Sequence, residues 1–417
     1  MTDLTVSQSD TDQPVKRVLL VAPQPFFTAA GTPINVLQMC RALTDIGYQV
    51  HLATLPTGES IDIDNLVYHR VWHLPLIKRV PVGFSIGKAI YDVLLAVKLV
   101  QLLSRHRYTA VHAIEEAVFF AVPIARLFGT PAVSDLDSDL CLQLKQNRSL
   151  VARGLASPAA PLRRWAIRRS AGVVTVAQHL TDMATEISPG TPVFEIRDIP
   201  LDAALRRPEP EQVERLRQEF GLGRERIAVY TGNFDQRQGV DVLVDAMPAV
   251  LKRFPDATLL LVGGEPDRIE AMRARAKQLG VGAAIRFAGK QPPETMPEFM
   301  ALANVLVSPR LEPLVTPLKI YTYMVSGRPI VATDLPTHTQ VLDERSAILA
   351  APTADGLAAG IARAFEDPAA ADRLAERARQ SVEQNHTYEA FRRQLGEVYA
   401  TVERGVERAV ERARDNS

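Results

Sequence analysis

The chain has 417 residues, of which 47% are hydrophobic and 23% are charged, and its 48 basic residues balance 48 acidic ones. This length favours at least two domains, because a single core rarely serves more than about 250–300 residues. The zero net charge offers no basic field for nucleic acid, and Cys40 and Cys141 are too few for a disulfide framework.

The start of the chain and its most apolar run argue against secretion and against membrane insertion. Residues 1–14 are polar and acidic, which predicts a disordered tail without a secretory signal. The apolar run from Ala89 to Leu103 is interrupted by Asp92 and Lys98, so we expect a buried helix there instead of a membrane span. These features predict a cytoplasmic protein.

From residue 16 onward, short β-rich runs alternate with helical patterns, and residues 15–200 are expected to form a first domain. Its helix at 33–46 carries an apolar stripe, and Gly47 suits the end of that helix. Strands are expected at 17–22, 48–54, 110–114, 132–135, 173–176 and 193–196. Such alternation is typical of a parallel sheet with crossover helices.

A Pro-rich linker from Ile199 to Pro210 precedes a second domain of the same kind, expected over residues 201–384. Its strands are expected at 227–231, 258–262, 285–287, 305–307, 330–332 and 347–349, and a charged helix at about 385–417. The predicted fold class is therefore α/β, with two doubly wound Rossmann-like domains. Ligands of such sheets bind at the carboxyl ends of the strands, so the cleft between the domains is the expected site.

A Thr-Pro pair opens a helix in each predicted domain, at Thr32-Pro33 and at Thr316-Pro317. Thr suits the N-cap and Pro the first helical position, and free N–H groups at such a helix end suit a phosphate. Gly31 would let the backbone approach that ligand. The alternative is that Thr-Pro simply starts a helix well.

Acidic residues and a histidine stand at two strand ends of the first domain. Asp135, Asp137 and Asp139 resemble a manganese-binding Asp-x-Asp pattern, but alternation favours a solvated or acceptor-binding acidic edge, and no metal site is predicted. His112 either lines the cleft or is a structural histidine. Glu115 and Glu116 suit the start of the next helix.

Basic residues concentrate between Arg148 and Arg169, with Trp165 among them, and two more lie earlier in the chain. They suggest either a solvated helix face or a patch that binds anionic lipid on the inner face of the cytoplasmic membrane. They are Lys78, Arg79, Arg148, Arg153, Arg163, Arg164, Arg168 and Arg169.

The segment Ser308–Asp334 contains Thr-Pro-Leu-Lys319, Ser-Gly-Arg-Pro329 and Ile-Val-Ala-Thr-Asp334, and it resembles the retaining glycosyltransferases of family 4, which have the GT-B fold. The resemblance extends over nearly the whole chain. It includes Gly31-Thr-Pro33, Val111-His-Ala113, Ile196-Arg-Asp-Ile-Pro200 and Tyr230-Thr-Gly-Asn-Phe234. It implies two domains facing across a cleft, with the closing helix crossing back to the first.

The resemblance also implies a set of donor-binding residues at both faces of the cleft. They are Gly31, Thr32, Gly232, Asn233, Arg237, Gln238, Arg310, Thr316, Leu318 and Thr322. The chain departs from the family at three of these positions. Asn233 and Gln238 stand where an Arg and a Lys commonly bind the diphosphate, and Thr322 where a Glu commonly holds the ribose.

For catalysis the resemblance points to Lys319, Glu312 and Asp137, where Asp137 takes the place of a histidine in many relatives. His112 and Asp135 would face the sugar or the acceptor. Retaining enzymes of this fold are thought to use no protein nucleophile, because the leaving diphosphate assists attack on the same face. No cofactor is implied beyond the nucleotide-sugar substrate, for which UDP-sugars are the commonest choice in the family.

The sequence therefore predicts a retaining, metal-independent hexosyltransferase that moves a sugar to a glycan, a lipid-linked or a small-molecule acceptor in envelope or exopolysaccharide synthesis. Nucleic acid is not expected as a partner. The alternative is a non-catalytic relative that binds a nucleotide or a glycan or acts as a scaffold, since Asn233, Gln238, Thr322 and Asp137 replace the usual functional residues.

Overall fold

The computed structural model of the chain describes residues 15–27, 31–75, 77, 85–146, 150–223, 226–311 and 315–415. The predicted tail at residues 1–14, together with Lys78, Arg79, Arg148 and Glu312, lies outside these residues. Among the described residues, no helix is long and apolar enough to cross a membrane.

The first half of the chain forms a seven-stranded sheet in the order β3-β2-β1-β4-β5-β6-β7, and every neighbouring pair is parallel. Its strands are Arg17–Ala22 (β1), Gln49–Thr54 (β2), Leu66–Arg70 (β3), Ala110–Ile114 (β4), Ala132–Leu136 (β5), Gly172–Thr175 (β6) and Val193–Glu195 (β7). Strand β3 was not predicted, because it lies at the sheet edge and is only partly buried. Its alternating side chains lack the continuous apolar run of the central strands.

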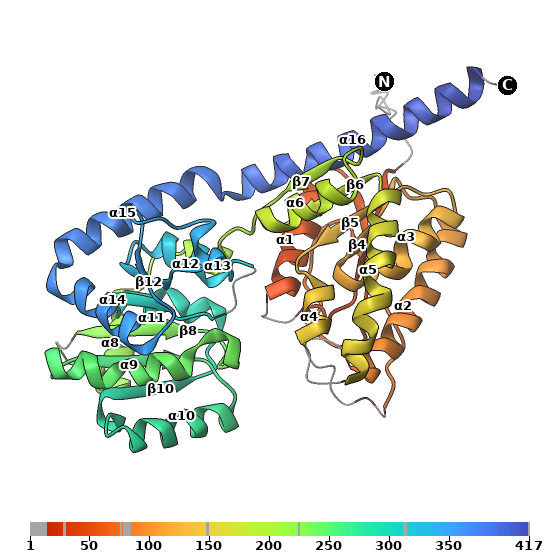
Figure 1. Ribbon diagram of the computed structural model, residues 1–417. Coiled ribbons are helices and arrows are strands. Elements are labelled where there is room, and N and C mark those ends of the chain that lie inside the picture. Colours follow the sequence, from red (N-terminus) through yellow and green to blue (C-terminus); the bar gives the residue numbers. More distant parts are fainter. Residues whose placement is uncertain are drawn as a thin grey trace, which may run out of the picture.

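Helices cover both faces of this sheet (Figure 1). They are Gly31–Ile46 (α1), Ile86–Arg105 (α2), Val118–Leu127 (α3), Leu140–Gln146 (α4), Leu150–Arg169 (α5) and Gln178–Ile187 (α6), with a short 3₁₀ turn at Glu115–Ala117. Helices α2, α3, α5 and α6 contribute to one core, and α1 contributes to the core on the opposite face. The expectation that residues 89–103 form a buried helix was wrong for one face of α2. Ile90, Val93, Val97 and Val100 are exposed, because the helix lies on the surface of the molecule.

The second half forms a six-stranded parallel sheet in the order β10-β9-β8-β11-β12-β13. Its strands are Ile227–Thr231 (β8), Thr258–Val262 (β9), Ile285–Gly289 (β10), Val305–Ser308 (β11), Ile330–Thr333 (β12) and Ile348–Ala350 (β13). Its helices are Pro210–Glu219 (α8), Val240–Arg253 (α9), Pro266–Gln278 (α10), Met296–Ala301 (α11), Lys319–Ser326 (α12), Pro336–Thr339 (α13), Ala354–Glu366 (α14) and Pro368–Asn385 (α15). The predicted linker contains a further short helix, Asp202–Leu205 (α7).

The last helix, Tyr388–Asp415 (α16), returns to the first sheet, where Figure 1 shows it in blue along the N-terminal half. Phe391, Leu395, Val398 and Val402 are buried in the same core as α1 and the central strands. Apolar burial contributes about 1.5–3 kcal/mol for each such side chain. Residues from the far end of the chain therefore complete the first core.

In both sheets the strand order reverses at one point, between β1 and β4 in the first sheet and between β8 and β11 in the second. The loops that leave these strands run to opposite sides of the sheet, so a crevice opens between them at the carboxyl ends. Doubly wound sheets bind their ligands at such switch points. This topology predicts a site at the loops that follow β1, β4, β8 and β11.

Candidate active site

A cavity of about 220 Å³ lies between the two halves of the chain, where the loops from both switch points meet. Its lining from the first half includes Gly31, Thr32, Asn35, Asp137, Ser138, Asp139 and Asp198. Its lining from the second half includes Arg237, Arg310, Val315, Thr316, Pro317 and Leu318. We call this space the cleft cavity. It brings together seven predicted site residues: Gly31, Thr32, Asp137, Arg237, Arg310, Thr316 and Leu318.

The helix starts beside the cavity differ from those predicted. Helix α1 already includes Gly31 and Thr32, so Thr32 lies in its first turn and is not the N-cap. Helix α12 begins at Lys319, and the Ile320 amide donates to the Pro317 carbonyl at 2.9 Å, which places Pro317 in a turn before the helix. The predicted N-cap at Thr316 was therefore wrong. Its side chain is hydrogen-bonded to the Tyr321 hydroxyl and does not cap the backbone.

The second half supplies a basic wall, which we define as Arg237 and Arg310 with Lys319 behind them. Lys319 does not line the cavity, but its amine lies 3.9 Å from the centre of the Tyr230 ring and close to Gly232. Burial, and then the charge of Arg310, lower the pKa of the Lys319 amine well below its ordinary value. Among the described residues, its Nζ atom has no hydrogen-bond partner. An anionic ligand would satisfy this amine and restore its charged form.

The loop between β8 and α9 is held closely against the loop that follows β11. The Leu311 amide donates to the Arg237 carbonyl at 2.9 Å, and Thr333 Oγ1 donates to the Arg310 carbonyl at 2.6 Å. Gly239 has φ of 68°, and a Cβ atom there would lie 2.0 Å from the Pro309 carbonyl oxygen. Only glycine fits this close approach. The packing of these loops fixes the backbone that carries both arginines.

Four other residues of the second half that were predicted to bind the donor substrate lie outside the lining of the cleft cavity. Gly232 lies beside the Lys319 amine, and Asn233 is exposed and accepts from the Asp235 amide at 3.2 Å. Gln238 is partly buried, and within the described residues its Oε1 atom has no partner. Thr322 is buried inside α12. Glu312 belongs to residues 312–314, which are not described.

The first half supplies an acidic wall, which we define as Asp137 and Asp198 with Glu115 and Asp135 behind them. Burial, then the charges of Asp135, Glu115 and Asp198, raise the pKa of Asp137 well above its usual range. Burial and then Asp135 raise the pKa of Asp198 to about 7. Glu115 has φ of 51° and a pKa of about 7, raised by burial and then by the Glu116 charge.

His112 and Asp135 were predicted to face the sugar or the acceptor, with a structural role as the alternative for His112, and the structure favours that alternative. This residue is fully buried, with Nδ1 2.9 Å from the Tyr399 hydroxyl of α16 and Nε2 3.0 Å from Asp135 Oδ2. The solvated alternative for the acidic edge was wrong, and the acceptor-binding alternative stays a prediction. Asp135 lies within β5 and is buried, and Asp139 pairs with Arg163 at 2.7 Å.

Asp198 and Asn35 were not singled out from the sequence. Asp198 lies in the Ile196-Arg-Asp-Ile-Pro segment after β7, and Asn35 donates from α1 to Asp137 Oδ1 at 3.4 Å. The position of Asp198 after a strand was the available signal. Among the described residues, no group of three or more His, Cys, Asp or Glu side chains is arranged to hold a metal ion.

A larger hollow of about 920 Å³ lies where the two halves join, and it is lined by Arg197, Gln340, Asp343 and His386 among others. Several of its charges pair within its own wall, Glu195 with Arg197 at 2.6 Å and Asp343 with Arg345 at 3.0 Å. The cleft cavity instead sets a basic wall against an acidic one. We therefore place the active site in the smaller cavity.

Two sequence families match the chain: a "Glycosyl transferase 4-like domain" over residues 30–193 and "Glycosyl transferases group 1" over residues 225–367. The chain is 27% identical to 2-deoxystreptamine glucosyltransferase of Streptomyces kanamyceticus, covering 81% of this chain and 90% of that protein. It is 25% identical to phosphatidyl-myo-inositol mannosyltransferase of Mycolicibacterium smegmatis, and the match covers 93% of this chain and 94% of that protein.

Solved structures with the same fold include sucrose-phosphate synthase of Thermosynechococcus elongatus, with a TM-score of 0.72, 22% identity, and coverage of 93% of this chain and 99% of that chain. Another is Anabaena Alr3699/HepE in complex with UDP, with a TM-score of 0.71, 17% identity, and coverage of 93% and 100%. The chain therefore belongs to the group 1, or family 4, glycosyltransferases and has their GT-B fold.

Proposed function

We propose that the chain is a retaining glycosyltransferase that takes a nucleotide-diphosphate sugar, with UDP-sugars as the first choice, and works without a metal ion. The observation that carries this proposal is the basic wall at the second switch point, where the buried Lys319 amine has no hydrogen-bond partner among the described residues. In this reaction Arg237, Arg310 and Lys319 stabilise the charge that grows on the leaving diphosphate. The acceptor hydroxyl then attacks from the face that the diphosphate leaves.

The test is thermal unfolding of the purified chain with UDP, GDP, ADP and TDP, with and without EDTA. A nucleotide present at about 100 times its dissociation constant adds about 2.7 kcal/mol to stability. We expect one nucleotide to raise the melting temperature, and EDTA to leave this shift unchanged. Lys319→Ala should abolish the shift, while Lys290→Ala should keep it, because Lys290 is exposed and pairs with Glu265.

The anomeric outcome needs a separate measurement. NMR of the product formed from the preferred nucleotide sugar should show the configuration of the donor. An inverted product would refute the retaining mechanism but leave donor binding intact. The acceptor is proposed to be a glycan, a lipid-linked sugar or a small molecule, in line with the varied names of the relatives.

A non-catalytic nucleotide-binding role is the second candidate, favoured by the positions of Asn233 and Thr322. Asn233 stabilises its own loop, and Thr322 is buried away from the cavity lining, so neither contributes there the charge that their family counterparts carry. A thermal shift with UDP, combined with no release of UDP from any nucleotide sugar at long incubation, would support this role.

We also propose a peripheral contact between the first half and an anionic membrane. Helices α2, α3 and α5 contribute to one core layer. Apolar residues are exposed on all three helices or at their ends: Ile90, Val93, Val97, Val100, Leu127, Phe128, Leu162 and Trp165. Arg164, Arg168 and Arg169 are exposed on α5, whereas Arg163 pairs with Asp139. Exposed apolar area flanked by basic residues suits a lipid interface.

The membrane proposal is tested by sedimentation with vesicles of phosphatidylglycerol at low salt. We expect the chain to sediment with them, and Val93→Asp with Val97→Asp to weaken this several-fold, because both side chains are exposed and would place charge at the lipid surface. The matched pair Glu186→Asp with Asp182→Glu, on α6, keeps its charge and should sediment like the natural chain. Equal sedimentation of all three proteins would exclude α2 from the contact.

A further inference from the structure

The guanidinium of Arg70 fastens together the loops that follow β1 and β2. Arg70 ends strand β3 at the edge of the first sheet. Its Nη1 atom donates to the Phe26 carbonyl at 2.6 Å and to the Thr57 carbonyl at 3.0 Å. Its Nη2 atom donates to the Glu59 carbonyl at 2.8 Å and to Ser60 Oγ at 3.2 Å. One side chain thus bonds to two loops at the carboxyl edge of the sheet.

The same two loops are also joined through their own backbones. The Phe27 amide donates to the Glu59 carbonyl at 2.7 Å, and the Glu59 amide donates to the Phe27 carbonyl at 3.0 Å. Gly58 has φ of 109°, and a Cβ atom there would overlap the Phe26 carbonyl, so only glycine fits. The Phe26 side chain is buried in the same core as α1. The loop after β1 is therefore closely held as far as Phe27.

This loop leads into the cleft cavity. Gly31 follows Phe27 by four positions, and Gly31, Thr32 and Asn35 at the start of α1 line the cavity. The loop after β1 is also one of the two that flank the switch point of the first sheet. When only a fraction of a protein has the binding conformation, the apparent affinity for the ligand falls by that fraction. The hydrogen bonds of Arg70 can therefore act on the cavity through the backbone.

The partners of Arg70 favour an arginine over a lysine. Backbone carbonyls carry no net charge, so these contacts depend on the number and spread of N–H donors. A guanidinium presents five donors in a planar fork, whereas a Lys ammonium presents three donors on one atom. The guanidinium also lies 5.3 Å from the centre of the Tyr68 ring. Arg70→Lys would keep the positive charge but could not reproduce these contacts.

We propose that Arg70 is a positioning residue for the sugar transfer, which holds the loop after β1 in the conformation that the donor sugar needs. Arg70 does not line the cavity and acts only through this loop. This inference rests on the proposed function, because it assigns the start of α1 to the nucleotide-sugar donor. The basic wall of the second half binds the diphosphate, and the first half completes the site around the sugar. Loss of Arg70 therefore weakens binding of the nucleotide sugar more than binding of the nucleotide.

The first measurement is hydrogen exchange of the peptide from residue 23 to residue 36, followed by mass spectrometry. This peptide should exchange faster in Arg70→Ala than in the natural chain, and millimolar guanidinium chloride should restore slow exchange by occupying the vacated space. Arg70→Lys should also exchange faster, despite its charge. Arg105→Ala, which removes an exposed arginine at the end of α2, should exchange like the natural chain. Unchanged exchange in Arg70→Ala would overturn the proposal.

The second measurement is calorimetric titration with UDP and with UDP-glucose. If about one tenth of the variant molecules hold the loop correctly, Arg70→Ala should bind UDP-glucose about tenfold more weakly than the natural chain does. UDP should bind almost equally to both proteins, because the basic wall is unchanged, and its binding also shows that the variant is folded. Guanidinium chloride should restore the affinity for UDP-glucose.

The two ligands separate the possible failures. An unchanged affinity for UDP-glucose in Arg70→Ala would overturn the positioning role, and so would an equal loss of affinity for UDP and UDP-glucose. A natural chain that binds neither ligand would instead refute the proposed function.

Discussion

The carboxyl group of Asp198 lies where its charged form is unfavourable. Burial and Asp135 raise its pKa from 3.8 to about 7. The folded chain thus binds a proton more tightly than the unfolded chain does. The stabilising effect of that proton is complete below about pH 3.8 and is lost as the pH rises through about 7.

Asp198→Asn is therefore expected to stabilise the free protein at pH 8 more than at pH 5. The amide resembles the protonated acid, so the variant avoids the cost of ionisation, and at about 1.4 kcal/mol per pKa unit the gain at pH 8 exceeds that at pH 5 by on the order of 2–3 kcal/mol. Thermal unfolding at both pH values measures this difference. A loss of stability at pH 8 would mean that the carboxylate has a cationic partner in the fold.

For individual residues, the sequence predicted which residue types line the cleft cavity but not which side chains pair with one another. Asp137, Arg237 and Arg310 line the cavity as expected. His112 could not be assigned from the sequence, because its partner Tyr399 is 287 positions away along the chain. Strand alternation placed Asp135 on a solvated or acceptor-binding edge, but it could not show that the side chain is buried and pairs with His112.

Among the helices and strands, α16 is the one whose packing is hardest to predict from the sequence. Its charged appearance comes from the exposed face, whereas Leu395 is fully buried in the first core. Tyr48 and Lys16 both hydrogen-bond to Glu403, and Tyr388 donates to Asp45 at 2.6 Å. These contacts join the helix to the start of the chain along most of its length.

Leu395→Ala is expected to destabilise the protein by about 2–5 kcal/mol, because it leaves a cavity in the first core. Urea unfolding followed by circular dichroism measures the loss. The control is Val406→Ala on the same helix, where the side chain is 40% exposed and the change should stay within about 0.5 kcal/mol. Similar values for the two variants would show that α16 does not pack as described.

The strands were easier to predict than the helix starts. The predicted ranges of β4, β8 and β9 coincide with the observed ones, since continuous apolar runs between turns are a strong signal for buried parallel strands. The start of α12 was placed two residues too early, because Thr-Pro is a good helix start locally but here serves a turn and a contact with Tyr321. Tertiary contacts decided that boundary.

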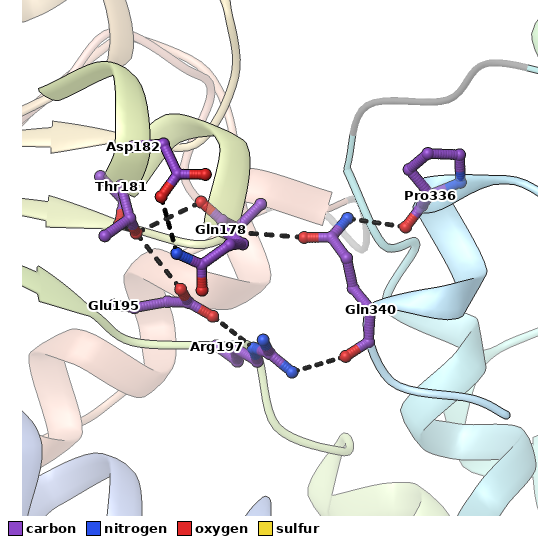
Figure 2. A network of polar contacts seen from close by, with 9 residues as sticks. Gln178, Thr181, Asp182, Glu195, Arg197, Pro336 and Gln340 are labelled. Carbon is purple, nitrogen blue, oxygen red and sulfur yellow. Dashed lines mark hydrogen bonds and ion pairs between the residues drawn. The ribbon is translucent and has the colours of Figure 1, made fainter. Parts of the chain in front are cut away.

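Across the whole molecule, one residue of the second half makes two contacts with the first (Figure 2). The Arg197 guanidinium donates to the backbone carbonyl of Gln340 at 2.7 Å, and the backbone N–H of Gln178 donates to the side-chain Oε1 of Gln340 at 3.2 Å. The cleft cavity measures about 220 Å³, which is below the about 300–1,000 Å³ usual for ligand sites. Entry of a nucleotide sugar therefore requires the halves to separate, and these contacts oppose that motion.

Arg197→Met is expected to increase the radius of gyration of the free chain, because it removes one of these contacts. Small-angle X-ray scattering compares it with Arg345→Met, which removes a guanidinium of the same hollow that is 81% exposed and pairs within its own half. Only Arg197→Met should expand the chain, and UDP should reverse part of the expansion. Identical scattering from both variants would assign the resistance to opening elsewhere.

The return of α16 to the first sheet has a consequence for biosynthesis. On the ribosome, β1 and α1 leave the exit tunnel early, while Phe391, Leu395 and Val398 follow only after the whole second half has been translated. Throughout that interval the nascent chain exposes the apolar face that α16 later covers, including the end of α1, where Ile46 lies next to Gly396. Exposed apolar surface of this kind is what chaperones bind and what drives aggregation. The N-terminal half should therefore depend on chaperones during translation, and a prematurely terminated product should be cleared by proteolysis.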